Sequence, residues 1–175
     1  MHHHFMIARQ KLSPLVSALL PLAGVIVALT SCAQRITSMN QSQLTDFATR
    51  YAAAWGSQKP DRVAAFYAAD GSLSVNAGAP SVGRAAITAT AQGFMAAFPD
   101  MVVKMDAVHG DGSHATFRWI WTGTNTGPGG TGKSVRVEGY EEWTIGGDGL
   151  IRESKGHYDE AGYQRRLQSG APAAH

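Results

Sequence analysis

The chain has 175 residues, of which 44% are hydrophobic and 16% are charged. This composition excludes an intrinsically disordered protein and suits one ordinary globular domain. The formal net charge is +2, and it falls to zero when Arg9 and Lys11, the only Lys, Arg, Asp or Glu residues before position 32, are left out. A neutral domain lacks the clustered basic face that nucleic acids need, so we expect no nucleic-acid partner.

The first 31 residues have the layout of an export signal. Arg9 and Lys11 precede an uncharged, largely apolar stretch over residues 15–29, which small residues follow, as in a secretory signal peptide. The alternative interpretation is an ordinary signal peptide or an uncleaved membrane helix, since about 20 residues are enough to cross a bilayer.

The single cysteine, Cys32, ends this stretch and leaves no partner for an internal disulfide. Residues 29–32, Leu-Thr-Ser-Cys, resemble the lipobox of bacterial lipoproteins. The resemblance implies a signal peptide over 1–31, diacylglycerol on Cys32, and a protein anchored to a membrane on the extracytoplasmic side of the cell envelope. Each buried methylene of an acyl chain contributes ~0.8 kcal/mol, so more than one chain gives a lasting anchor.

The remaining sequence divides into a polar tether over 32–43, a domain over 44–168 and a disordered tail over 169–175. Its first part has helical periodicity. Apolar residues at three- and four-residue spacing predict a helix ending at Trp55, and a second, shorter helix begins at Pro60. A turn at Asp70-Gly71, a short strand over 72–76 and a third helix over 84–98 complete this part.

After residue 100 the hydrophobic period changes to two, which is typical of strands. We expect four strands joined as a meander by glycine-rich turns, and then a short helix over 161–167. The strands begin near Met101 and then cover 114–124, 134–145 and 150–158. Three helices on one face of a curved antiparallel sheet make the fold class α+β.

This order resembles the cone-shaped nuclear transport factor 2-like fold, which ketosteroid isomerase shares. The short motifs are most similar to its SnoaL-like polyketide cyclase branch. They are Phe66-Tyr67 with Asp70-Gly71, Phe98-Pro99-Asp100, residues 123–127 and 131–133, Gly149-Leu150-Ile151, and residues 164–167. The sequence departs from the branch at Asn125, where histidine is usual, and in lacking a closing Gln-Leu-Gly. The resemblance implies an apolar cavity between helices and sheet, and dimers formed through the exposed sheet face.

Glu141 is the first candidate for acid–base chemistry. It shares a mostly apolar strand face with Val137, Gly139, Trp143 and Ile145, so we expect it to face the cavity, where desolvation raises the pKa of a carboxyl. By resemblance it lies near the oxyanion-stabilising aspartate of ketosteroid isomerase. The alternative is a salt bridge at the rim with Arg118 or Arg136.

His157 and Asp159 are the second candidate, because residues two apart on a strand can form an oriented acid–base pair. In SnoaL-like cyclases an acidic residue on this strand moves the proton, and Asp159 is the nearest match. The alternative is that Asp159 caps the helix that follows it.

Tryptophans dominate the candidate ligand contacts. They form either a stacking wall for a flat hydrophobic ligand or ordinary core. The candidate ligand-binding residues are Trp119, Trp121, Trp143, Tyr51, Asn76 and Arg118. No histidine spacing indicates a metal, so we expect neither a metal nor another cofactor.

Two functions stay open at this point. The first is a cofactor-free enzyme of the cyclase, isomerase or hydrolase type that acts on a small hydrophobic carbonyl compound. In it Asp159 and His157 move the proton and Glu141 stabilises the oxyanion. The second is a non-catalytic ligand-binding or assembly module at the cell envelope, with a homodimer contact through residues 136–142 on the outer sheet face.

Overall fold

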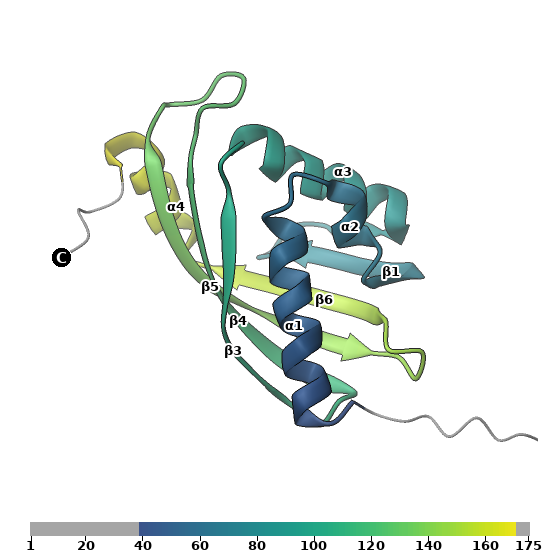
Figure 1. The fold of residues 1–175 in the computed structure, drawn as a ribbon. Helices are drawn as coiled ribbons and strands as arrows, with labels where there is room; N and C mark the ends of the chain where they lie inside the picture. Colours follow the sequence, from purple (N-terminus) through teal and green to yellow (C-terminus); the bar gives the residue numbers. More distant parts are fainter. Residues whose placement is uncertain (1–38, 171–175) are drawn as a thin grey trace, which may run out of the picture. The chain divides into compact units, whose positions relative to one another are not determined.

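The computed structural model describes residues 39–170, which form four helices and one six-stranded sheet (Figure 1). The signal-peptide and lipobox predictions and Cys32 lie outside the described residues. The elements are α1 (Gln41–Trp55), α2 (Pro60–Ala64), β1 (Tyr67–Val75), β2 (Ser81–Val82), α3 (Gly83–Ala97), β3 (Val102–Gly110), β4 (His114–Thr124), β5 (Ser134–Ile145), β6 (Ile151–Tyr158) and α4 (Glu160–Ser169).

Helix α1 begins at a capping box. The Asn40 side chain accepts a hydrogen bond from the Gln43 amide at 2.9 Å, and the Gln43 side chain accepts one from the Asn40 amide at 3.0 Å. These reciprocal bonds satisfy amides that the first helical turn leaves unpaired. The predicted tether over 32–43 is therefore too long, because residues 41–43 are helical. At the other end, α4 runs to Ser169, one residue into the predicted tail.

The sheet has the order β2-β1-β6-β5-β4-β3. The meander from β3 to β6 is antiparallel, as predicted, whereas β1 and β6 are parallel neighbours. The predicted turn at Asp70-Gly71 is wrong, since both residues lie within β1, where the register with β6 shifts between Tyr67 and Ser72. A β-carbon on Gly71 would lie 2.7 Å from the Ile151 carbonyl oxygen, so this irregularity requires glycine.

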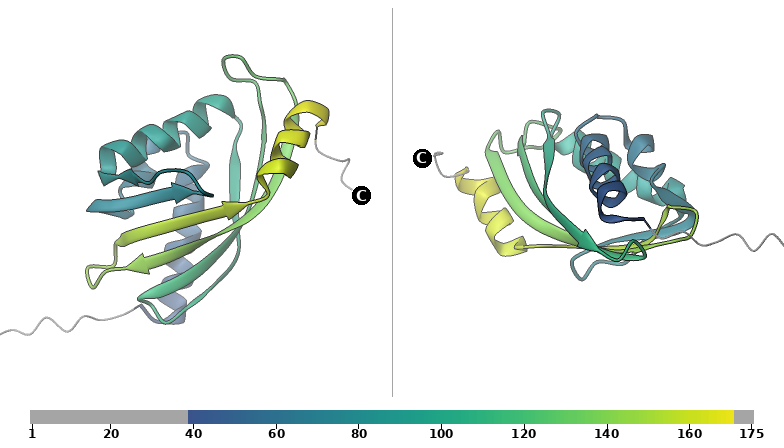
Figure 2. Two further views of the ribbon diagram at one scale, coloured as in Figure 1. Left: turned by 180° about the vertical axis from the view of Figure 1, so that it is seen from behind. Right: turned by 60° about the horizontal axis from the view of Figure 1, so that its bottom comes forward.

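The layers agree with the predicted α+β class. Figures 1 and 2 show α1, α2 and α3 on the concave side of the curved sheet, with α4 at the end of β6. The core between these layers is apolar and aromatic. Its largest fully buried side chains are Trp143, Tyr51, Tyr67, Phe98 and Phe117. Within residues 39–170, none of the helices is long and apolar enough to span a membrane.

Candidate functional site

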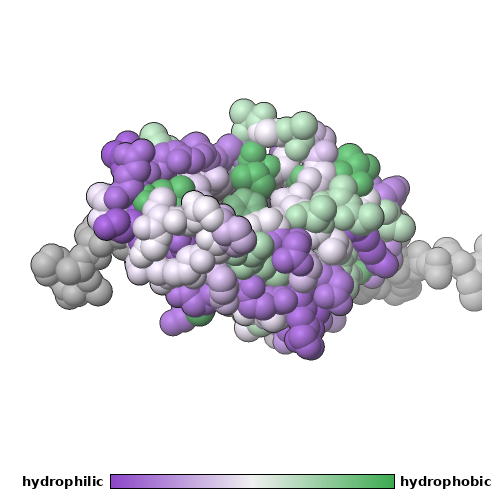
Figure 3. Space-filling view, turned by 90° about the horizontal axis from the view of Figure 1, so that it is seen from above, coloured by the Kyte–Doolittle hydropathy of each residue, from purple (hydrophilic) through white to green (hydrophobic). Residues whose placement is uncertain are grey.

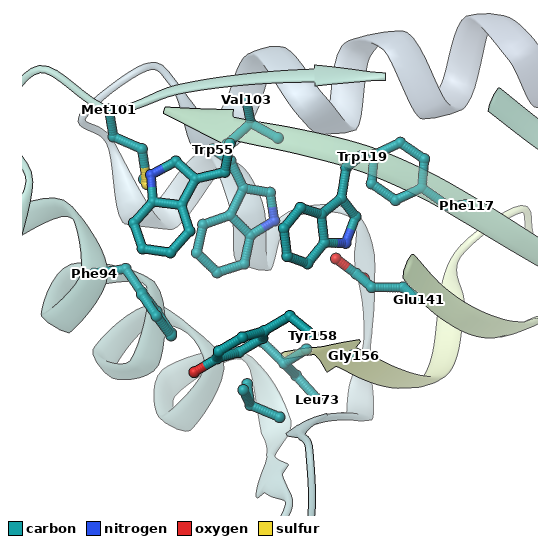
Figure 4. Close-up of a pocket in the computed structure, with 12 residues that line it drawn as sticks. Trp55, Leu73, Phe94, Met101, Val103, Phe117, Trp119, Glu141, Gly156 and Tyr158 are labelled. Carbon is teal, nitrogen blue, oxygen red and sulfur yellow. The ribbon is translucent and has the colours of Figure 1, made fainter. Parts of the chain in front are cut away.

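A cavity of about 70 Å³ lies between the concave sheet face and the helices (Figure 4). A water molecule occupies roughly 10–15 Å³ on this scale, so the cavity holds a small organic molecule. Apart from Glu141 and Tyr158, its lining is non-ionisable and mostly apolar, as is usual for ligand pockets. The lining residues are Trp55, Leu73, Val75, Phe94, Met101, Val103, Phe117, Trp119, Trp121, Glu141, Gly156 and Tyr158. Figure 3 shows a hollow in which apolar residues are exposed at the surface.

Strand β5 places Glu141 in this cavity. The burial of β5 alternates, with Val137, Glu141 and Trp143 buried and their neighbours on the outer face exposed. The predicted inward position of Glu141 is confirmed. The alternative of a rim salt bridge is wrong, because Arg136 pairs with Glu138 on the outer face and Arg118 also lies on that face.

One oxygen of the Glu141 carboxyl is fixed by three hydrogen bonds. Oε2 accepts from the Tyr51 hydroxyl at 3.0 Å, from Trp143 Nε1 at 2.8 Å and from the Ser154 hydroxyl at 2.6 Å. Among residues 39–170 no group donates to Oε1 of the same carboxyl. A proton that binds Glu141 therefore goes to Oε1, since the lone pairs of Oε2 are already engaged.

A second layer of hydroxyl groups sets the direction of this network. The Tyr51 and Tyr67 hydroxyl oxygens are 2.7 Å apart. Tyr51 has a single hydroxyl proton and gives it to Glu141, so Tyr67 must donate to Tyr51. Burial raises the pKa of both phenols, and the nearby Glu141 charge raises it further. Both tyrosines thus remain donors that support the carboxylate.

Burial also raises the pKa of Glu141, while the hydrogen bonds from Ser154, Trp143 and Tyr51 act in the opposite direction and only partly offset it. A carboxylate with a raised pKa is a stronger base than an exposed one. It is therefore better matched to proton transfer near neutral pH.

This shift predicts a particular pH dependence of stability. In the folded protein the Glu141 pKa lies above its ordinary value of 4.5, so above about pH 4.5 the native state binds more protons than the unfolded state. The contribution of Glu141 to the free energy of unfolding should therefore fall as the pH rises from 4.5 through the folded pKa, and then level off. Urea unfolding of the wild type and of Glu141→Gln across this pH range measures this contribution. The effects of the other carboxyls cancel in the difference between the two free energies of unfolding. A difference that stays constant with pH would contradict the raised pKa.

The tryptophans divide into two groups. Trp119 and Trp121 line the cavity, as the stacking-wall hypothesis requires. Trp143 is fully buried behind it, where its ring stacks on Phe117 with centroids 4.8 Å apart and its Nε1 holds Glu141. Trp143 is therefore core and a positioning residue for Glu141, in place of the predicted ligand contact.

The structure does not bring Asp159 or His157 to the cavity. Asp159 is the N-cap of α4, where its side chain accepts from the Gly162 amide at 2.9 Å, so the capping alternative is the one observed. His157 lies on the outer sheet face, stacked on Tyr140 and 3.2 Å from a Glu142 oxygen. The two side chains are thus engaged separately, and the predicted acid–base pair is absent from the described residues.

Two further candidates also lie elsewhere. Arg118 is exposed on the face of β4 opposite Trp119. Asn76, at a positive φ of 48°, accepts from the Tyr158 amide at 3.0 Å and donates to Glu160 at 3.3 Å. Its role is to join the end of β1 to the start of α4. Tyr51 does contribute to the site, through its hydroxyl group on Glu141 and without lining the cavity.

Sequence reasoning missed several site residues. Tyr67 and Ser154 were not singled out, although both complete the polar network under Glu141. The sequence does carry a signal for Ser154, because alternation places it on the strand face opposite Lys155 and His157. Trp55, Phe94 and Tyr158 line the cavity from three separate elements, so only their tertiary arrangement identifies them.

Within residues 39–170, no three His, Cys, Asp or Glu side chains gather in a way that would hold a metal ion. Among the residues that line the cavity, Glu141 is the one that carries a carboxyl group.

A curved sheet with three helices over its concave face is the architecture of the ketosteroid isomerase-like fold. The chain belongs to the SnoaL-like domain family, whose model matches residues 48–154.

Solved structures of this fold are similar to the chain. A protein with a ketosteroid isomerase-like fold from Catenulispora acidiphila, in complex with trimethylamine, is 24% identical with a TM-score of 0.63, and the match covers 73% of this chain and 95% of that one. TsrD from Streptomyces laurentii is 19% identical with a TM-score of 0.64, covering 74% and 97%. SalBIII, an epoxide hydrolase/cyclase-like enzyme with a role in pyran ring formation in the polyether salinomycin, is 12% identical with a TM-score of 0.61. The match covers 70% of this chain and 95% of that one. A comparison with curated proteins found no match.

Proposed function

We propose that the protein is a cofactor-free acid–base catalyst in which Glu141 moves a proton on a small hydrophobic carbonyl compound. The observation that carries the proposal is the Glu141 carboxyl itself. It is buried in an apolar cavity, three donors hold one of its oxygens, and the other oxygen is left for a ligand. A merely structural carboxyl would be expected to have both oxygens satisfied.

In the proposed step Glu141 is the group that accepts and returns the proton. The ionised carboxyl takes a proton through Oε1 from the carbon next to the carbonyl group, and the electron pair of the broken C–H bond moves to the carbonyl oxygen as an enolate. The same carboxyl then returns a proton to the oxygen, which gives the enol, or to a different carbon of a conjugated enolate, which gives an isomer of the substrate; return to the original carbon gives only hydrogen exchange. Oε2 keeps its three donors throughout, so the carboxyl need not reorient.

Deuterium exchange tests the proposal without knowledge of the natural substrate. The full-length protein is incubated in D₂O with cyclohexanone and related small ketones, and NMR records the loss of α-protons. Exchange above the buffer rate, rising with pH through one ionisation, is the expected result. Ketones that bind in the cavity but exchange no faster than in buffer would instead favour the binding module.

We also propose that the protein is anchored to a membrane of the cell envelope through lipid on Cys32, on the support of the lipobox-like residues 29–32. Replacing Cys32 with alanine should release the protein from the membrane fraction, or leave it unprocessed, and should remove the mass of the lipid. Membrane association and processed mass that match the wild type would defeat the proposal.

The homodimer contact on the outer face of β5 stays a prediction. Sedimentation of the purified protein measures the oligomeric state and so tests it.

A further inference from the structure

The chain has four tryptophans, and their indole N–H groups differ in a way that bears on the ligand. Trp143 Nε1 donates to Glu141. The buried indole nitrogens of Trp119 and Trp121 have no hydrogen-bond partner among residues 39–170, and both residues line the cavity. The unpaired donors are thus concentrated at the candidate site.

An unpaired buried donor is unfavourable. It gives up its hydrogen bond with water and receives nothing in exchange, so native proteins rarely keep more than one in one place. A ligand oxygen that accepts a hydrogen bond from such a group removes this cost. The lining therefore favours a ligand that brings acceptors.

Of the two unpaired indole donors on β4, Trp119 is the nearer to Glu141 in the register of the sheet. It is paired with Gly139 across β4 and β5, and a β-carbon on Gly139 would lie only 2.4 Å from the Trp119 ring. The missing side chain lets the indole lie directly over β5, two residues before Glu141 on the same face. Figure 4 shows the Trp119 ring nitrogen on the side that faces the Glu141 carboxyl.

We infer that the Trp119 indole N–H holds the carbonyl oxygen of the substrate while Glu141 handles the proton. The ligand class is then an uncharged compound with an oxygen acceptor, such as a ketone. This inference rests on the proposed function and adds a second catalytic residue to it, because the donor would also stabilise the negative charge that develops on that oxygen.

Charge distinguishes this ligand class from its competitors. No Lys, Arg or His side chain lines the cavity, so a carboxylate or phosphate ligand would be buried beside Glu141 without compensation. An alkylammonium ion is the serious competitor, since aromatic faces and an ionised carboxyl both attract cations. It would leave the indole donors of Trp119 and Trp121 unpaired.

The experiment follows the indole N–H signals of the full-length protein by ¹H–¹⁵N NMR, assigned by single Trp→Phe variants. The probes are cyclohexanone, methylenecyclohexane, which has the same shape without the oxygen, and tetramethylammonium. Cyclohexanone should move the Trp119 N–H proton downfield, and methylenecyclohexane should not. The Trp143 signal is the internal reference, because its N–H is already bonded to Glu141.

Two variants make the test quantitative. Trp119→Phe should weaken cyclohexanone binding about five- to tenfold, the effect of one lost hydrogen bond, and should leave methylenecyclohexane binding nearly unchanged. Glu141→Gln should keep cyclohexanone binding, because the substitution removes only the proton acceptor.

The outcomes separate the two proposals. The Trp119 inference is overturned if the hydrocarbon shifts the N–H signal as the ketone does, or if Trp119→Phe binds both equally well. It is also overturned if tetramethylammonium binds more tightly than cyclohexanone in the wild type and loses its binding in Glu141→Gln. In each of these cases Glu141-dependent deuterium exchange would still support the proposed function. Trp119-dependent ketone binding without any such exchange would reject the catalyst and leave the inferred binding mode standing.

Discussion

Replacing Glu141 with glutamine is expected to lower the rate of α-proton exchange on a bound ketone by roughly 10²–10⁴-fold, the usual contribution of a positioned acid or base. Glutamine has nearly the same shape, and its carbonyl oxygen can take the place of Oε2, facing the Tyr51, Trp143 and Ser154 donors. Its amide then occupies the position of Oε1 and cannot accept the proton. The exchange rate at saturating ketone, followed by NMR in D₂O, is the measurement.

Asp159→Ala is the matched control for this substitution. It removes the other carboxyl that the sequence nominated, which the structure places at the N-cap of α4. Loss of the cap should cost about 1 kcal/mol of stability and leave the exchange rate unchanged. Equal losses of exchange in the two variants would contradict the assignment of proton transfer to Glu141 alone.

Replacing Trp143 with alanine is expected to be the most damaging single truncation for stability, at about 3–5 kcal/mol. The side chain is fully buried, stacks on Phe117 and makes an edge contact with Tyr51. Its removal leaves a new void and takes one of the three donors from the buried Glu141 carboxyl. Urea unfolding measures the free-energy change.

Trp119→Ala provides the comparison, because it makes the same truncation at a second tryptophan. Trp119 is only partly buried and already borders the cavity, so its truncation enlarges an existing space. We expect a smaller cost, of about 1–3 kcal/mol. If Trp119→Ala proved as destabilising as Trp143→Ala, the packing difference between the two indoles would be refuted.

The sequence predicts the fold well where the hydrophobic period is strong. The strands over 114–124 and 134–145 have the predicted bounds, because apolar residues recur at every second position through most of each strand and glycine-rich loops mark their ends. It fails at Asp70-Gly71, where a typical turn pair lies within β1 at a register shift. Local turn propensity was overridden there by pairing with β6, which is distant in sequence and cannot be read from a short window.

The candidate site also divides into residues that local sequence pattern predicts and residues whose position depends on distant parts of the chain. Alternation along β5 was enough to place Glu141 inside, since its neighbours on that face are apolar. Asp159 and His157 could not be judged in this way. Whether a residue just past a strand end faces a cavity or caps a helix depends on where the chain turns, and α4 begins immediately after Asp159. The Tyr67–Tyr51–Glu141 network joins residues from β1, α1 and β5, so no spacing rule finds it.

The donors on Oε2 come from three different elements, namely α1, β5 and β6. The three hydrogen bonds to the carboxylate therefore form only when α1 is correctly docked on the sheet. Burial of the charged group lowers the stability of the fold. Selection for thermal stability alone, without selection for activity, should therefore replace Glu141 early with an uncharged residue. Its retention among variants evolved under both pressures would mark it as a residue kept for chemistry at the expense of robustness.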